Sequence, residues 1–317
     1  MAEALACYAA AIDTAEQTNE REVLAESLRR SAIAYHQRAE PGVARELCER
    51  SYEIATKIGN LVLAAEALNA LAGFDFELGS METAREKFSR ALQLGGTSAT
   101  LRARIEQNLG ILANIQGALA EATAHYRQSL LAFESAGDTR GCAIAYHNLG
   151  MVSADRERWD EADGYFLLSL ELARTLGDIH LQGLSLLNQA EVYLARQEYD
   201  LARQNAETAL GIFDQLGSRI DKADAYKMIG RAYRGSGRYP LAESRFRAAA
   251  ELAVSTGSRL SEAEVSRELG LLYEEMGRKK EALSLLHDAR GLFSQLDARL
   301  DLSDVSTRIN QLEEALA

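Results

Sequence analysis

The chain has 317 residues, of which 47% are hydrophobic and 26% charged, and only 2 are proline. This composition is typical of a folded protein and excludes a disordered one. Asp and Glu outnumber Lys and Arg by 47 to 35, which gives a formal net charge of -12. A general binder of nucleic-acid phosphates carries the opposite charge, so nucleic acid is not an expected partner.

The cysteines and the hydropathy pattern indicate the compartment. Cys7, Cys48 and Cys142 lie far apart and form no Cys-x-x-Cys pair, so neither a disulfide framework nor a zinc knot is expected. No segment approaches the roughly 18 consecutive apolar residues of a membrane span. The start of the chain lacks the basic region of a signal peptide. We therefore expect a soluble, cytoplasmic protein with no membrane partner.

The strongest pattern is an internal period. A small residue in the middle of each apolar stretch recurs at spacings of 38 and then 40 residues, at Ala72, Gly110, Gly150, Ala190, Gly230 and Gly270. An alanine follows each one by 12 residues, at Ala84, Ala122, Ala162, Ala202, Ala242 and Ala282. Further columns, in the order after the small residue, are Phe88, Tyr126, Phe166, Ala206, Phe246 and Leu286, then large residues at Met81, Leu119, Trp159, Tyr199 and Tyr239. Such self-similarity indicates a repeat protein.

Each repeat has the pattern of two helices. Small and apolar residues at i, i+3, i+4 and i+7 form one helical face, as in Tyr146, Leu149, Gly150 and Ser153. Glycine tolerates the left-handed conformation at a helix end, which predicts helix ends at Gly137, Gly177, Gly217 and Gly257. The residues that follow are predicted N-caps, at Asp138, Asp178, Ser218 and Ser258. Pro41 and Pro240 fall where a second helix begins.

These columns resemble the tetratricopeptide repeat. The fullest match to its Leu-Gly, Tyr, Ala, Phe, Ala signature is Ile229-Gly230, Tyr233, Ala242, Phe246 and Ala249. The repeat here is longer than the usual unit of about 34 residues, which is similar to the Leu-Gly-Asn group (LGN/Pins), kinesin light chains and bacterial regulators. The resemblance implies an all-α, right-handed α–α superhelix in which the first helix of each hairpin lines a concave wall.

The predicted organisation is a single solenoid over residues 1–317. It comprises a half-repeat helix (1–17), a capping helix (299–317) and seven hairpins, at 19–58, 60–96, 98–137, 138–177, 178–217, 218–257 and 258–297. A capping helix is indicated by the apolar stripe Leu302, Val305, Ile309, Leu312 and Leu316. A start in mid-repeat is expected of a segment of a longer polypeptide. It also leaves an apolar face through which two copies could form a homodimer.

Reactive constellations are not predicted. The five histidines show no metal-binding spacing, and no phosphate-binding glycine motif occurs. Cys142 and His147 are five residues apart, so they do not share a helix face. We therefore expect a non-enzymatic protein with no catalytic residue, metal or cofactor.

A column of asparagines marks the predicted concave wall. Asn108, Asn148 and Asn188 recur at spacings of 40. The resemblance to the Leu-Gly-Asn group and kinesin light chains implies that such asparagines bond the main chain of an extended peptide. The second asparagine of that motif is absent, because Ile111, Met151 and Glu191 stand there. His147 and Met151 complete this part of the predicted partner-binding set. The alternative is that the asparagines tie neighbouring repeats together.

Basic residues form the other part of the predicted site. Lys227, Arg231, Arg234 and Arg267 lie on first helices and would receive carboxylates or phosphates. The alternative is ordinary pairing with the nearby acids Asp224, Glu264 and Glu268. An apolar floor for an anchor side chain, or else core between repeats, is predicted from Ile111, Ile115, Met151, Leu187 and Leu194.

Two functions fit these patterns. The first is a protein-interaction scaffold that binds a peptide or protein partner in its concave groove. The alternative is a sensor or regulatory segment of a larger bacterial signalling or transcription-regulator chain.

Overall fold

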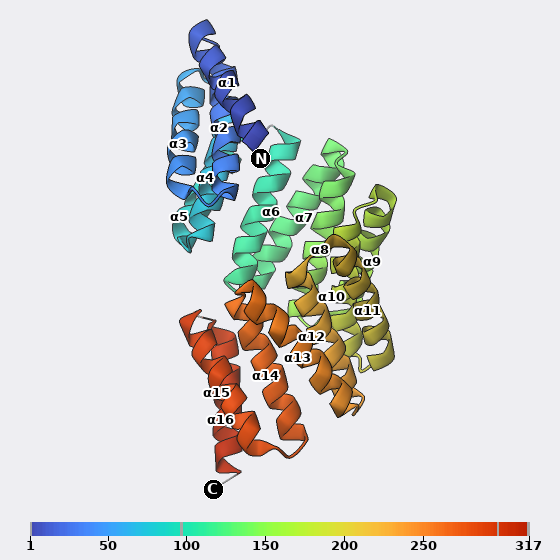
Figure 1. Cartoon of the computed structure of the whole chain (residues 1–317). Helices are drawn as coiled ribbons and strands as arrows, with labels where there is room; N and C mark the ends of the chain where they lie inside the picture. Colours follow the sequence, from blue (N-terminus) through green and yellow to red (C-terminus); the bar gives the residue numbers. More distant parts are fainter. Residues whose placement is uncertain (1, 96–97, 297, 316–317) are drawn as a thin grey trace. The chain divides into compact units, whose positions relative to one another are not determined.

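The computed structural model describes residues 2–95, 98–296 and 298–315. Within these ranges the regular structure consists of sixteen α-helices, and no strand is present (Figure 1). The predicted all-α class is confirmed. No helix in the described ranges is long and apolar enough to cross a membrane.

The chain divides into two compact units, residues 1–156 and residues 157–317. The helices of the N-terminal unit are α1 (Ala2–Thr18), α2 (Arg21–Gln37), α3 (Pro41–Lys57), α4 (Leu61–Glu77), α5 (Met81–Gly95), α6 (Ala99–Ile115), α7 (Leu119–Ala136) and α8 (Thr139–Asp155). Those of the C-terminal unit are α9 (Trp159–Leu176), α10 (Ile179–Ala195), α11 (Tyr199–Leu216), α12 (Arg219–Gly235), α13 (Tyr239–Thr256), α14 (Arg259–Glu275), α15 (Lys279–Gln295) and α16 (Arg299–Glu314).

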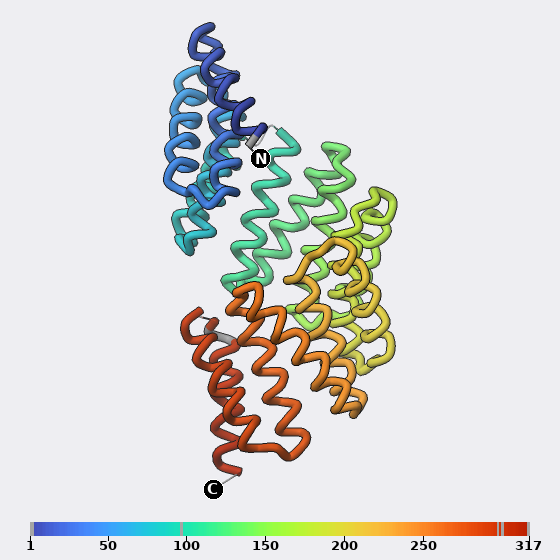
Figure 2. The backbone as a smooth tube through the Cα atoms, in the orientation of Figure 1, coloured from blue at the N-terminus to red at the C-terminus, as the bar shows by residue number. Residues whose placement is uncertain are grey.

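Within each unit, every helix packs against the next one along the chain, as the tube in Figure 2 shows. The first helices of successive hairpins also touch, so that α4 contacts α2 and α6 in one unit, and α12 contacts α10 and α14 in the other. Such nearest-neighbour contacts define a helical solenoid, in which each repeat completes the core of its neighbour.

The periodic columns form the core between paired helices. The alanine column is fully buried at Ala242 and Ala282, and Phe246 has no exposed surface. Gly230 of α12 lies against the ring of Phe246, because a Cβ atom at Gly230 would be 2.5 Å from that ring. A glycine and an aromatic residue thus let α12 and α13 approach closely.

The helix ends follow the predicted signals with one exception. Gly137, like the equivalent glycines of later repeats, is left-handed with φ of 65° and ends its helix. The side chains of Asp138, Asp178 and Ser258 accept hydrogen bonds from first-turn amides, as predicted. The prediction for Ser218 was wrong, because its hydroxyl bonds the carboxylate of Asp221 instead. Both prolines lie in the first turn of a second helix, at Pro41 and Pro240.

The last helix covers the preceding repeat. Val305, Ile309 and Leu312 of α16 are buried in one cluster with residues of α15 such as Leu286 and Phe293. Leu302 packs partly buried against the same cluster. Leu316, predicted to continue this stripe, lies outside the described residues.

A buried carboxylate joins three helices of the N-terminal unit. Asp75 of α4 is 4% exposed. One of its oxygens accepts a hydrogen bond of 2.7 Å from Arg45 of α3, and the other accepts one from Lys87 of α5. Burial alone would raise the pKa of Asp75, but the hydrogen bonds from Lys87 and Arg45 outweigh it and lower that pKa. The ionised form therefore stabilises the fold.

Replacing Asp75 by asparagine is expected to lower the free energy of unfolding of α3 to α5 by about 2 kcal/mol at neutral pH, because two cations lose their counter-charge. A group with a lowered pKa stabilises the fold above its unfolded pKa, so the difference from the parent should shrink as the pH falls below about 4. Urea unfolding followed by hydrogen exchange of α3 to α5 measures both effects. The control is Asp214→Asn, whose exposed pair with Lys222 should be worth less than about 0.5 kcal/mol. Equal changes for the two variants would contradict the prediction.

Candidate binding grooves

The N-terminal unit carries a groove on its first helices α2, α4 and α6. It encloses about 340 Å³, and its polar lining comprises Arg29, His36, Glu66, Asn69, Glu77, Arg104 and Asn108. We call it the N-terminal groove. The helices expose this face because each turns its small and apolar stripe toward its own hairpin partner.

Two side-chain amides lie side by side in this groove. The Nδ2 atom of Asn108 donates a hydrogen bond of 3.1 Å to the Oδ1 atom of Asn69, which belongs to the preceding hairpin. The alternative stated for the asparagine column, a tie between repeats, is thus realised at Asn108. Both residues nevertheless line the groove. An amide has two donor hydrogens and an acceptor oxygen, so one shared bond leaves capacity for a ligand.

The charges of the N-terminal groove are only partly paired. Arg29 forms an ion pair of 2.8 Å with Glu66. The His36 ring stacks on Phe74, with 4.4 Å between ring centroids, and its Nε2 atom is 3.3 Å from Glu77. Arg104 is exposed and forms no hydrogen bond or ion pair with any residue that the structure describes. The groove therefore presents one basic group that is available to a ligand.

The predicted residues on α8 differ in accessibility. Met151 is 40% exposed, whereas His147 is 8% exposed and leaves little surface for a partner. Asn148 is half-buried, and its Nδ2 atom is buried with no hydrogen-bond partner among the described residues. Successive helical residues differ by about 100° in direction, which separates His147 from Asn148. Asn188, half-buried on α10, belongs to the C-terminal unit.

The C-terminal unit carries a second groove, which encloses about 430 Å³. It is formed by α10, α12 and α14 together with the first residues of α9 and α11. We call it the C-terminal groove, and its lining comprises Trp159, Glu191, Leu194, Ala195, Tyr199, Arg231, Arg234, Gly235 and Glu275. The equivalent helices thus form grooves in both units.

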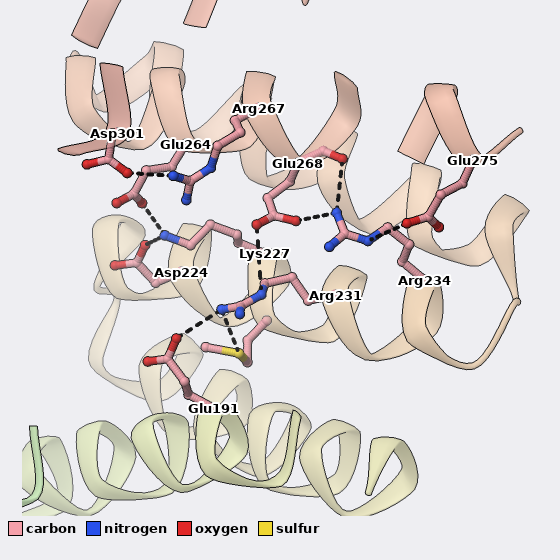
Figure 3. Close-up of polar contacts among 11 residues, drawn as sticks. Glu191, Asp224, Lys227, Arg231, Arg234, Glu264, Arg267, Glu268, Glu275 and Asp301 are labelled. Carbon is pink, nitrogen blue, oxygen red and sulfur yellow. Dashed lines mark hydrogen bonds and ion pairs between the residues drawn. The ribbon is translucent and has the colours of Figure 1, made fainter. Parts of the chain in front are cut away.

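Two predicted basic residues meet at one buried acid beside this groove. Glu268 of α14 is 5% exposed. It pairs with Arg234, and it lies 3.8 Å from the Nε atom of Arg231. Each arginine has a further carboxylate, because Arg231 donates to Glu191 at 3.1 Å and Arg234 lies 3.6 Å from Glu275. Figure 3 shows Arg231 between Glu191 and Glu268, and Arg234 between Glu268 and Glu275.

The other two predicted basic residues are also paired. Lys227 contacts Asp224 at 3.0 Å and also Glu264, and Arg267 contacts Asp301 of α16 (Figure 3). Burial alone would lower the pKa of Lys227, but the neighbouring carboxylates outweigh it and raise that pKa, so the ammonium remains charged. The pairing named as the alternative for this patch is present with Asp224, Glu264 and Glu268. An anionic ligand would have to displace these carboxylates.

The predicted apolar floor divides between surface and core. Leu194 lines the C-terminal groove, and Ile115 is 59% exposed. Leu187 is 6% exposed and packs in the core between repeats, the alternative reading of its position.

Sequence reasoning missed several lining residues. Asn69 precedes Asn108 by 39 residues rather than 40 and so falls outside the asparagine column. Glu191 and Glu275 belong to no column, although their spacings of 40 from Arg231 and 41 from Arg234 join successive first helices. Trp159 and Tyr199 were recognised only as members of a column of large residues.

No group of histidine, cysteine, aspartate and glutamate side chains in the described ranges is arranged to hold a metal ion. What the two grooves offer is side-chain amides, paired charges and aromatic walls. Helical hairpins stacked in sequence, with grooves on their first helices, define an α-solenoid protein.

The tetratricopeptide repeat model matches residues 141–215, 181–254 and 221–295 of the chain. The protein is therefore of the tetratricopeptide-repeat type, as the resemblance predicted. No curated protein matches the sequence. The closer likeness to the Leu-Gly-Asn group stays a prediction.

Three solved structures illustrate the likeness in fold. A tetratricopeptide repeat protein from Parabacteroides merdae ATCC 43184 is 16% identical, with a TM-score of 0.62, and the match covers 89% of this chain and 98% of that one. A Rap protein complexed with competence and sporulation factor is 14% identical, with a TM-score of 0.62 and coverage of 99% and 98%. A signal transduction ATPase with a tetratricopeptide repeat sensor, from Pyrococcus horikoshii, is 16% identical, with a TM-score of 0.63 and coverage of 89% and 42%. At such identities the similarity concerns the fold alone.

Proposed function

We propose that the chain is a protein-interaction scaffold that binds a peptide or protein partner along the first helices of its hairpins. The observation that carries the proposal is the N-terminal groove, where Asn69 and Asn108 lie together with unused hydrogen-bonding capacity. The likeness in fold to a Rap protein complexed with competence and sporulation factor supports it.

The chemistry of the amides suits an extended main chain. Each residue of an extended peptide offers one N–H and one C=O group. A side-chain amide can satisfy either of them without regard to the ligand's side chains. Arg104 would add a charge-assisted bond to a carbonyl or carboxylate of the same ligand. The groove would thus provide main-chain affinity and a single charge for orientation.

A second function is supported by another comparison. The fold is also similar to that of a signal transduction ATPase with a tetratricopeptide repeat sensor, of which the match covers 42%. In this alternative the chain would be the sensor or regulatory segment of a larger signalling or transcription-regulator protein. An effector domain encoded in the same open reading frame would favour the sensor, and a stand-alone repeat protein would favour the scaffold.

The proposal is tested by selecting binders from a library of random displayed peptides against the purified chain. Affinities of the selected peptides are then measured by fluorescence polarisation for the parent and for Asn108→Ala, Asn148→Ala and Arg231→Glu. We expect at least one of these variants to weaken each peptide about five- to tenfold, because one main-chain or charged hydrogen bond is lost.

The matched control is Asn310→Ala on α16, whose amide is exposed and outside both grooves. It should leave the affinity within about twofold of the parent. The proposal fails if no peptide is enriched over an unrelated helical protein. It also fails if none of the groove substitutions changes the affinity.

A further inference from the structure

The carboxylates of the C-terminal groove have unequal demands on them. Buried Glu268 pairs with both Arg231 and Arg234. Glu191, with its side chain 43% exposed, accepts one hydrogen bond, from Arg231. Glu275, 41% exposed, has an ion-pair distance of 3.6 Å to Arg234 and no hydrogen bond from any residue that the structure describes. A carboxylate has about four acceptor positions, so Glu191 and Glu275 retain most of theirs.

The net charge beside this groove is negative. Two arginines stand against three carboxylates there, and the whole network in Figure 3 has four basic and six acidic side chains. An added anion would meet this excess and would also compete with Glu268 for the arginines. An added cation would meet unused acceptors.

The walls of the groove complement a flat cation. Trp159 and Tyr199 begin α9 and α11, and both line the groove. Gly235 makes room for the tyrosine, because a Cβ atom at that position would be 2.2 Å from the Tyr199 ring. Aromatic faces attract ammonium and guanidinium groups within about 6 Å of the ring centre. A planar guanidinium can also bond a carboxylate in the same plane.

We infer that the C-terminal groove binds a basic side chain of the partner, arginine in preference to lysine, between the carboxylates of Glu191 and Glu275 and against the rings of Trp159 and Tyr199. This inference rests on the proposed function, of which it names one subsite. The state of Glu275 agrees with it. Burial and the neighbouring Glu268 and Glu274 raise the pKa of that carboxyl against the effect of Arg234, and a bound cation would relieve this repulsion.

The subsite can be tested directly, because Trp159 is the only tryptophan of the chain. Its fluorescence is followed while the intact protein is titrated with N-acetyl-arginine amide, with the neutral isostere N-acetyl-citrulline amide and with N-acetyl-glutamate amide. We expect a saturable change with the arginine probe at roughly millimolar concentration. Citrulline, which lacks the charge, should bind at least about fivefold more weakly, and glutamate should not bind.

Glu191→Gln and Glu275→Gln should each weaken the arginine probe about fivefold, because they keep the shape of the side chain and remove its charge. The control Glu251→Gln alters an exposed acid of α13 outside the groove and should have no effect. Circular dichroism of each variant verifies that the fold is retained. Equal binding of arginine and citrulline, or unchanged binding in both groove variants, would overturn the inference.

The displayed peptides separate this inference from the proposed function. Selected peptides whose affinity does not change when their basic residues become glutamine would overturn the arginine subsite and leave the scaffold function standing. If no peptide is selected while the arginine probe still requires Glu191 and Glu275, the scaffold function fails and the subsite remains.

Discussion

Replacing Phe246 by alanine is expected to destabilise the hairpin of α12 and α13 by about 3–5 kcal/mol, because the cavity forms in a fully enclosed site. Phe246 has no exposed surface and packs in one cluster with residues of α14 and α15. Repeats contact only their neighbours, so the loss should be concentrated in α12 to α14. Urea unfolding combined with hydrogen exchange by mass spectrometry measures both its size and its location.

A double-mutant cycle tests the close contact behind this value. Gly230→Ala alone should cost about 1–3 kcal/mol, because its Cβ atom meets the Phe246 ring. In the Phe246→Ala background the same methyl group enters the cavity, so its cost should vanish or reverse. The control Val254→Ala, on the same helix and 67% exposed, should change stability by less than about 0.5 kcal/mol. Additive effects of Gly230→Ala and Phe246→Ala would contradict the assigned contact.

This contact also explains how far the sequence could predict the fold. A small residue in α12 and a ring in α13 are separated by a fixed 16 residues, so the same contact recurs in every repeat and appears as two columns. Helix ends are equally local, because Gly137 and Asp138 act on the residues beside them. Ser218 is the exception, since the nearby Asp221 competes for its hydroxyl.

The candidate site was less predictable, because its contacts join different repeats through long side chains. Arg231 reaches Glu191 in the preceding hairpin and Glu268 in the following one. Such a pair needs one acid and one base in register and produces no column. The identity of the four basic residues could therefore be predicted, but not that each would be paired. Asn69 was missed because one shorter repeat shifts it by a single position.

Replacing Glu268 by leucine is expected to destabilise the C-terminal unit by about 3 kcal/mol, because two guanidinium groups lose a buried counter-charge. Arg231 and Arg234 keep Glu191 and Glu275 as second partners, which places the cost at the lower end for a buried pair. Glu268→Gln should cost less, since its amide oxygen can still accept a hydrogen bond. Urea unfolding of the two variants gives the order, with Glu251→Gln as the exposed control.

The decisive variant removes all three charges together. When Arg231→Met and Arg234→Met are added to Glu268→Leu, stability should recover by at least about 2 kcal/mol, because apolar side chains replace an uncompensated pair of cations. A structural contribution of the glutamate side chain itself would give no recovery. Loss of stability beyond Glu268→Leu in the triple variant would show that the arginines stabilise the helices α10, α12 and α14 independently of Glu268. The network would then be a scaffold for Glu191 and Glu275 rather than a set of charges held by one buried acid.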